Sequence, residues 1–164
     1  MRKIVLTFFG AGLLRPAPGT WGSLAAIPAA WGLHLIGSFW LLAAATPALY
    51  YVGVRQTRAE IAGSDGDHDP SWIVIDEAVG MWIALWPVSY GAMFAGVSFW
   101  ALWPGVLVAF AAFRFFDIRK PWLVGRADAR GDATGVMLDD VWAGVFAALV
   151  VVVLGVVAHA WIIG

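Results

Sequence analysis

Charged residues are confined to short stretches of this chain, and long apolar stretches separate them. Asp, Glu, Lys and Arg are absent from residues 16–54, 78–113 and 141–164. A membrane-spanning helix needs roughly 20 consecutive apolar residues, so each of the first two stretches is long enough to cross a bilayer and return. The third is long enough to cross once. The pattern therefore predicts an all-α, polytopic membrane bundle of about five transmembrane helices.

Local turn signals divide the two longer apolar stretches. We expect one turn near Gly37 and Ser38 and another in the region from Pro87 to Gly96. The first helix is short and contains Pro28, so it either spans fully or forms a re-entrant segment. The chain is expected to be a single membrane domain, 1–164, with spans at 22–37, 38–55, 72–90, 97–117 and 138–161.

Composition agrees with a membrane protein. Hydrophobic residues make up 62% of the chain and charged residues 13%, whereas soluble domains are nearer a quarter charged. The formal net charge of −1 argues against a nucleic-acid partner. The chain has no Cys, which excludes a disulfide framework and a Cys-based metal site.

The basic residues predict an orientation. All 10 Lys and Arg residues lie in 1–15, 55–77 and 114–140. With five crossings these stretches share one side of the membrane, which the positive-inside rule makes the cytoplasmic side. The N-terminus begins like a signal peptide but lacks a small-residue cleavage site, so we expect it to be retained in the cytoplasm. The C-terminus is then periplasmic.

The same topology brings five carboxylates to one depth. Asp76 and Glu77 lie about one turn inside the third span, Asp117 at the end of the fourth, and Asp139 and Asp140 at the start of the fifth. Carboxylates at this depth repel one another and are costly to desolvate. A bound divalent cation would make the same cluster energetically favourable, because it attracts every carboxylate. Mg²⁺ fits best, because it accepts a few carboxylates and binds phosphate oxygens. Taken alone, Asp139 and Asp140 fit equally well as solvated residues at a helix start.

Two basic residues accompany these acids. Arg114, Asp117 and Lys120 are spaced i, i+3 and i+6, and they share one face if the helix continues to Pro121. That face would present cation, anion and cation to a phosphate. Alternatively, Arg114 and Asp117 form a purely structural ion pair. Lys120 would then extend its ammonium to the membrane–water interface without binding a ligand.

A Pro-Gly turn precedes the first span. In the segment RPAPGTWGS (15–23), Thr20 is placed as an N-cap and Ser23 follows three residues later. Free backbone N–H groups at a helix start attract phosphate, and the two hydroxyls add donors. The alternative is a tight turn followed by a cap with no ligand.

Four sequence blocks together resemble the signature of the bacterial phosphatidylglycerophosphatase A family. The blocks are PGTWGSLAAIP (18–28), DPSWIVIDEAVGMWI (69–83), FRFFDIRKPW (113–122) and LDDVWAGV (138–145). They cover most of the chain in the family's order. The resemblance implies a small bacterial inner-membrane enzyme that uses Mg²⁺ to convert phosphatidylglycerophosphate to phosphatidylglycerol, with its active site facing the cytoplasm. It implies a phospholipid substrate and no required protein partner, and leaves the oligomeric state open.

The motif residues of the family are found at individual positions of this sequence. The motif positions present are Pro18, Gly19, Thr20, Gly22, Ser23, Asp69, Asp76, Glu77, Arg114, Asp117, Lys120, Pro121, Asp139, Asp140 and Gly144. Arg15 and the acidic stretch 64–69 depart from the pattern. Small glycines one turn after the acids, Gly80 and Gly144, predict a close approach of the third and fifth spans.

These residues receive separate expected roles. The metal ligands are expected to be Asp76, Glu77, Asp139 and Asp140. The phosphate is expected to contact Gly19, Thr20, Gly22, Ser23, Arg114 and Lys120. Catalysis is assigned to Asp76, Glu77, Asp117, Arg114 and Lys120. The nucleophile is either a metal-activated water or Asp117 itself, and His68 is either a proton donor or a surface residue.

Other functions fit the sequence less well. The same fold acting on another lipid phosphomonoester, such as phosphatidic acid, is the main alternative. An ion-coupled transporter would also use buried acids. However, the outer halves of the expected spans carry only His34 and His159 as ionisable residues, which leaves a conduction path without polar lining.

Overall fold

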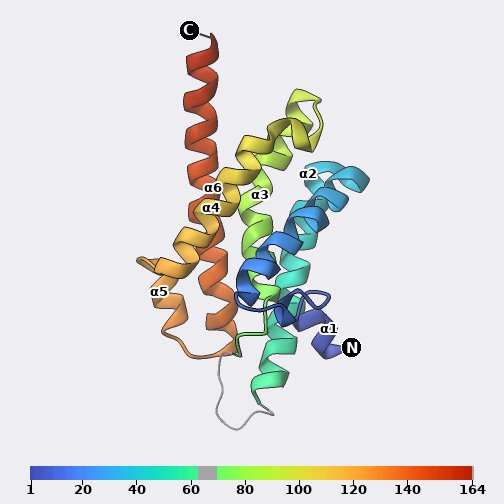
Figure 1. Ribbon diagram of the computed structural model, residues 1–164, viewed down its shortest axis with the longest axis vertical. Coiled ribbons are helices and arrows are strands. Elements are labelled where there is room, and N and C mark those ends of the chain that lie inside the picture. Colours follow the sequence, from blue (N-terminus) through green and yellow to red (C-terminus); the bar gives the residue numbers. More distant parts are fainter. Residues whose placement is uncertain (63–69, 164) are drawn as a thin grey trace.

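The computed structural model of the protein is helical, with no strand among the described residues, 1–62 and 70–163 (Figure 1). Its helices are α1 Arg2–Leu6, η1 Ala11–Leu13, α2 Pro18–Ile61, α3 Ile75–Ala95, η2 Phe99–Leu102, α4 Trp103–Arg119, α5 Leu123–Asp128 and α6 Ala133–Ile163. The predicted all-α fold is confirmed. The predictions for His68 and Asp69 fall outside the described residues.

Helix α2 is broken in its middle. Gly37 (φ −144°, ψ 24°) and Ser38 (φ 56°, ψ −155°) leave helical geometry, so the helical stretches 18–36 and 39–61 run in opposite directions. Figure 1 shows the first stretch rising to this turn and the second returning past the level of α1. The predicted turn at Gly37 and Ser38 is therefore confirmed.

Within the described residues, four helices are long and apolar enough to cross a membrane. They are α2, α3, α4 together with η2, and α6. The two stretches of α2 coincide with the first two predicted spans, and the total of five crossings stays a prediction.

The second predicted turn lies at the end of its expected region. Helix α3 continues through Pro87 and ends at Ala95, and its C-cap residue Gly96 adopts the left-handed conformation (φ 66°) that favours glycine. Transmembrane helices tolerate an internal proline, because neighbouring groups satisfy the freed backbone carbonyl.

Helix α6 begins at Ala133, five residues before the predicted 138. The Gly135 N–H donates to the Asp132 carboxylate at 2.6 Å, which satisfies one of the free donors of the first turn.

Helix α3 forms the centre of the bundle and packs against α2, α4 and α6. Its approach to α6 depends on two glycines. A Cβ on Gly144 would overlap the backbone oxygen of Gly80, and a Cβ on Gly80 would lie 2.5 Å from the backbone oxygen of Asp140. The close approach predicted at Gly80 and Gly144 is confirmed, and it places the start of α6 directly beside the start of α3.

We expect Gly144→Ala to destabilise the protein by about 1–3 kcal/mol, because the new methyl group would push two helix backbones apart. Thermal unfolding in detergent measures this change. Gly155→Ala is the matched control on the same helix, since nothing lies within 4 Å of a Cβ there. Equal unfolding temperatures for the two variants would contradict the proposed close packing.

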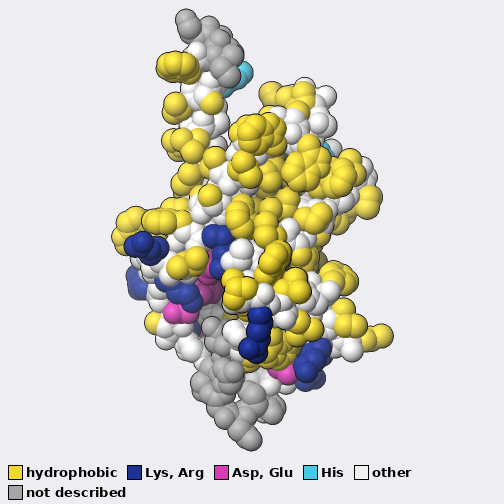
Figure 2. Space-filling view, viewed as in Figure 1, with side chains coloured by type: hydrophobic (Ala, Val, Ile, Leu, Met, Phe, Trp, Pro, Cys, Tyr) yellow, Lys and Arg dark blue, Asp and Glu magenta, His cyan; other side chains and the backbone are white. Residues whose placement is uncertain are grey.

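Charged side chains gather at one end of the molecule. Figure 2 shows Lys, Arg, Asp and Glu over the end that holds α1 and α5, while the visible surface toward the other end is mainly hydrophobic. This distribution follows the clustering of charge in the sequence. It places the candidate chemistry at the charged end of the helices.

Candidate active site

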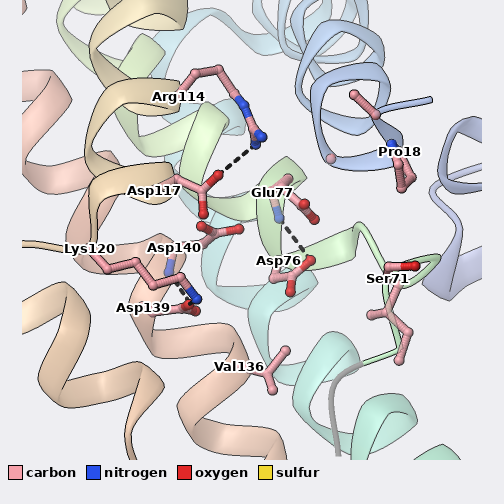
Figure 3. Close-up of a pocket in the computed structure, with 13 residues that line it drawn as sticks. Pro18, Ser71, Asp76, Glu77, Arg114, Asp117, Lys120, Val136, Asp139 and Asp140 are labelled. Carbon is pink, nitrogen blue, oxygen red and sulfur yellow. Dashed lines mark hydrogen bonds and ion pairs between the residues drawn. The ribbon is translucent and has the colours of Figure 1, made fainter. Parts of the chain in front are cut away.

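A pocket of about 260 Å³ opens at the charged end, between the start of α2, the start of α3, the end of α4 and the start of α6 (Figure 3). It is lined by every ionisable residue that the sequence singled out as catalytic or metal-binding: Asp76, Glu77, Arg114, Asp117, Lys120, Asp139 and Asp140. Gly19 also lines it, whereas Thr20, Gly22 and Ser23 do not. The fold therefore brings the predicted acids and bases together and leaves part of the predicted phosphate-binding segment outside.

Three of the carboxylates form a tight cluster. Asp76 and Glu77 lie in the first turn of α3, and Asp140 reaches them from α6. One carboxylate oxygen from each lies within 4.8 Å of the other two. Both aspartates are buried, with 7% and 2% of their surface exposed. An all-oxygen donor set of this kind is typical of a site for a hard divalent cation.

Two oxygen atoms of this cluster support the assignment. Glu77 Oε2 and Asp140 Oδ1 are buried and have no hydrogen-bond partner among the described residues. A buried carboxylate oxygen without a partner is strongly destabilising. Among the described residues that line the pocket, five are carboxylates and two are cationic, so a bound Mg²⁺ would satisfy both the unpaired oxygens and the excess negative charge. The residues present thus fit the ion that the sequence predicts.

Asp139 lies apart from this cluster. Its Oδ2 accepts from the Lys120 ammonium at 2.9 Å. Consecutive residues on an α-helix point about 100° apart, so Asp140 faces α3 while Asp139 faces the end of α4. The structure therefore groups three of the four predicted metal ligands and pairs the fourth with a cation.

Arg114 is held from two sides. Its Nη1 lies 2.7 Å from Asp117 Oδ2 and donates to Ser23 Oγ at 3.4 Å. Its Nε is buried and has no partner in the described part of the chain. The Arg114–Asp117 ion pair, which the sequence left open as an alternative, is present. It leaves Arg114 with unused N–H donors beside the pocket.

Lys120 lies just after the end of α4, and its backbone is not helical. Helix α4 ends at Arg119, and Lys120 is left-handed (φ 46°, ψ 51°), so the condition for a shared helical face, a helix that continues to Pro121, is not met. The proline disfavours helical geometry in the residue before it. The Lys120 ammonium also pairs with Asp128 of α5. Burial alone would lower its pKa, but the hydrogen bonds to Asp128 and Asp139 outweigh burial and raise the pKa of Lys120 above its usual range.

Helix α2 starts two residues earlier than its predicted cap. Ala17 is the N-cap residue and Pro18 occupies the first turn, so Thr20 is not the N-cap. Proline suits this position because it lacks the N–H that would have no intrahelical partner there. A Cβ on Gly19 would overlap Glu77 Oε1 and would lie 3.2 Å from Arg114 Nη1. Gly19 is thus the point at which α2 touches both the acidic cluster and Arg114.

Ser23 and Gly22 do not line the pocket but contact residues that form it. Ser23 is fully buried, and its Oγ donates to the Gly19 carbonyl oxygen at 2.8 Å while it accepts from Arg114. A Cβ on Gly22 would lie 2.7 Å from Val74 Cβ. Ser23 therefore positions Arg114, and Gly22 lets α2 pack closely on the segment that precedes α3.

Some lining residues were not singled out by the sequence. Ala17, Ser71, Ile73 and Val136 complete the wall, and Asp128 holds Lys120 from outside the pocket. The apolar residues and Ser71 carried no signal beyond their proximity to predicted residues. The acidic character of Asp128 was visible, but its partner could not be identified without the turn between α4 and α5.

One family model and several known proteins are similar to this chain. Residues 4–155 match the family model described as Phosphatidylglycerophosphatase A. The chain is 40% identical over 147 residues to Phosphatidylglycerophosphatase A of Haemophilus influenzae, covering 87% of this chain and 82% of the relative. The Escherichia coli protein of the same name is 34% identical over 166 residues, covering 95% and 83%. A Putative phosphatidylinositol-3-phosphatase of Bacteroides thetaiotaomicron is 34% identical over 165 residues, covering 98% and 94%. No solved structure matches the chain significantly.

Proposed function

The chain belongs to the phosphatidylglycerophosphatase A family and is a phosphatase, and from this premise we propose that it hydrolyses phosphatidylglycerophosphate with Mg²⁺. In this reaction water attacks the terminal phosphorus, the phosphate ester bond breaks, and phosphatidylglycerol and inorganic phosphate are released. The observation that carries the proposal is the cluster of Asp76, Glu77 and Asp140, with two buried and unpaired carboxylate oxygens, beside two basic side chains.

The metal requirement rests on the same three carboxylates. Asp76, Glu77 and Asp140 would hold Mg²⁺, since their oxygens converge and two of them lack another partner. When bound, Mg²⁺ supplies Lewis acidity and a template for the phosphate oxygens. Without a cation, this negatively charged pocket would repel a phosphomonoester, because like charges in a poorly solvated site raise the energy of both.

The basic groups would bind and orient the phosphate. Arg114 has a buried Nε without a partner, and Lys120 has three N–H donors of which two engage Asp128 and Asp139. The backbone N–H of Gly19, which lines the pocket at the start of α2, lacks the intrahelical partner of later residues. Together these donors would stabilise negative charge on the phosphate oxygens during an in-line displacement.

We favour water over Asp117 as the nucleophile. Asp117 Oδ2 lies 2.7 Å from Arg114 Nη1. An ion pair this short stabilises the carboxylate and makes it a weaker nucleophile. Asp117 would therefore hold Arg114 in place, while the pocket carboxylates orient the attacking water.

The proposed location is the cytoplasmic face of a bacterial inner membrane. The pocket lies at the charged end of apolar helices, and Lys and Arg side chains lie on the visible face of that end in Figure 2. A lipid headgroup sits at this depth while its acyl chains remain among the apolar surfaces. The enzyme would thus reach its substrate without removing it from the bilayer.

A panel of lipid phosphomonoesters tests the substrate. Phosphate release by purified protein would be compared for phosphatidylglycerophosphate, phosphatidic acid and phosphatidylinositol 3-phosphate. We expect phosphatidylglycerophosphate to give the highest kcat/KM. The similarity to the Bacteroides thetaiotaomicron protein makes a phosphorylated inositol lipid the second candidate. A higher kcat/KM for that lipid would overturn the proposed substrate, and no release from any lipid would overturn the proposed activity.

A further inference from the structure

The Lys120 ammonium has an ion-pair partner outside the pocket. Asp139 meets it from the pocket wall at 2.9 Å, and Asp128 meets it from α5. Asp128 does not line the pocket, and 44% of its side-chain surface is exposed. The contact of Asp128 with the pocket is its ion pair with Lys120, so we expect an effect of Asp128 on the reaction to pass through that ammonium.

The chain folds back tightly to make this pair. Helix α4 ends at Arg119, Lys120 turns into the left-handed region, and the short helix α5 returns Asp128 to the ammonium eight residues later. Gly125 sits against this turn, where a Cβ would lie 2.6 Å from the Lys120 backbone oxygen. The backbone of Lys120 and its ammonium are therefore fixed by the same segment.

We propose that Asp128 is a positioning residue, which holds the Lys120 ammonium at the pocket so that its third N–H donor is directed to the substrate phosphate. Two carboxylates from different helices fix the ammonium more completely than Asp139 alone. A lysine side chain is otherwise free to adopt many rotamers and to move away from the site. This inference rests on the proposed phosphatase function, in which Lys120 stabilises charge on the phosphate oxygens.

A double-mutant cycle tests the proposal with the full-length protein. Asp128→Asn keeps the shape of the side chain and removes its charge. We expect it to lower kcat for phosphatidylglycerophosphate by about tenfold, because a misplaced catalytic group costs rate, with KM changed less than about twofold. Glu60→Gln is the matched control, because Glu60 forms an exposed pair with Arg2 away from the pocket. Its kcat should equal that of the unmodified enzyme.

The same substitution in a Lys120→Ala background separates positioning from a structural role. If Asp128 acts only through Lys120, Asp128→Asn should cause no further loss of kcat in that background. An additive loss, or an unchanged kcat in the single variant, would overturn the proposal.

Amine labelling provides a readout that needs no enzymatic activity. The chain contains only two lysines, Lys3 and Lys120, so Lys3 serves as an internal reference in mass spectrometry. Asp128→Asn should raise the labelling rate of Lys120 relative to Lys3 by roughly two- to fivefold, the range expected for loss of an exposed ion pair. An unchanged ratio would overturn the positioning role. If the unmodified protein released no phosphate, the proposed function would fail while the labelling still reported on Asp128.

Discussion

Asp140→Asn is expected to lower phosphate release from phosphatidylglycerophosphate by about 10³-fold while the protein still folds and inserts. A metal ion contributes several kcal/mol of charge stabilisation to such a reaction, and each 1.36 kcal/mol corresponds to a factor of ten. Asp140 supplies one of the three clustered carboxylates, and its Oδ1 has no other partner in the described chain. The amide would keep the shape of the side chain and remove the charge that the cation needs.

Thermal unfolding distinguishes loss of the ion from loss of the fold. Mg²⁺ should raise the unfolding temperature of the unmodified protein, since a ligand that binds only the folded state stabilises it. This rise should disappear in Asp140→Asn. Without Mg²⁺ the variant should be at least as stable as the unmodified protein, because it lacks an unpaired buried charge. An Mg²⁺-dependent rise that survives the substitution would remove Asp140 from the metal site.

Gly19→Ala is expected to reduce kcat by about 10²-fold with little change in stability. The new Cβ would overlap Glu77 Oε1. A carboxylate at the end of a side chain can move aside at small energetic cost, but its displacement misplaces a group that must be held accurately for the reaction. Phosphate release and thermal unfolding, measured on the same preparation, check the two halves of this expectation.

A second glycine in α2 provides the control for Gly19→Ala. Nothing lies within 4 Å of a Cβ on Gly32, so Gly32→Ala should leave kcat unchanged and should not lower the unfolding temperature, since alanine is a better helix former than glycine. Full activity of Gly19→Ala would show that the contact between the start of α2 and Glu77 has no part in catalysis. A large loss of stability would instead assign Gly19 a packing role like that of Gly144.

The sequence predicts the long helices well and the short ones poorly. Long charge-free stretches identify α2, α3, α4 and α6, and the signals at Gly37 and Gly96 locate two turns that the structure contains. Helices α1 and α5 have only 5 and 6 residues. Helices this short are not stable alone and depend on tertiary contacts, so no local pattern indicates them.

The sequence predicts which residues form the site better than it predicts which of them pair with one another. Every acidic and basic residue assigned to the reaction lines one pocket. This was predictable because the topology of an apolar protein places these charges at one depth in the membrane. Which acid meets which base depends on the direction in which each side chain leaves its helix. Asp139 therefore pairs with Lys120, away from Asp76, and Ser23 supports Arg114 from behind.

The most direct test of the central claim is phosphate release from phosphatidylglycerophosphate by purified protein, with and without Mg²⁺, beside an Asp76→Asn variant. Asp76 belongs to the carboxylate cluster at the start of α3. We predict release that requires both Mg²⁺ and Asp76. Release that continues at an unchanged rate without divalent cations, or in Asp76→Asn, would contradict a magnesium site built from these carboxylates.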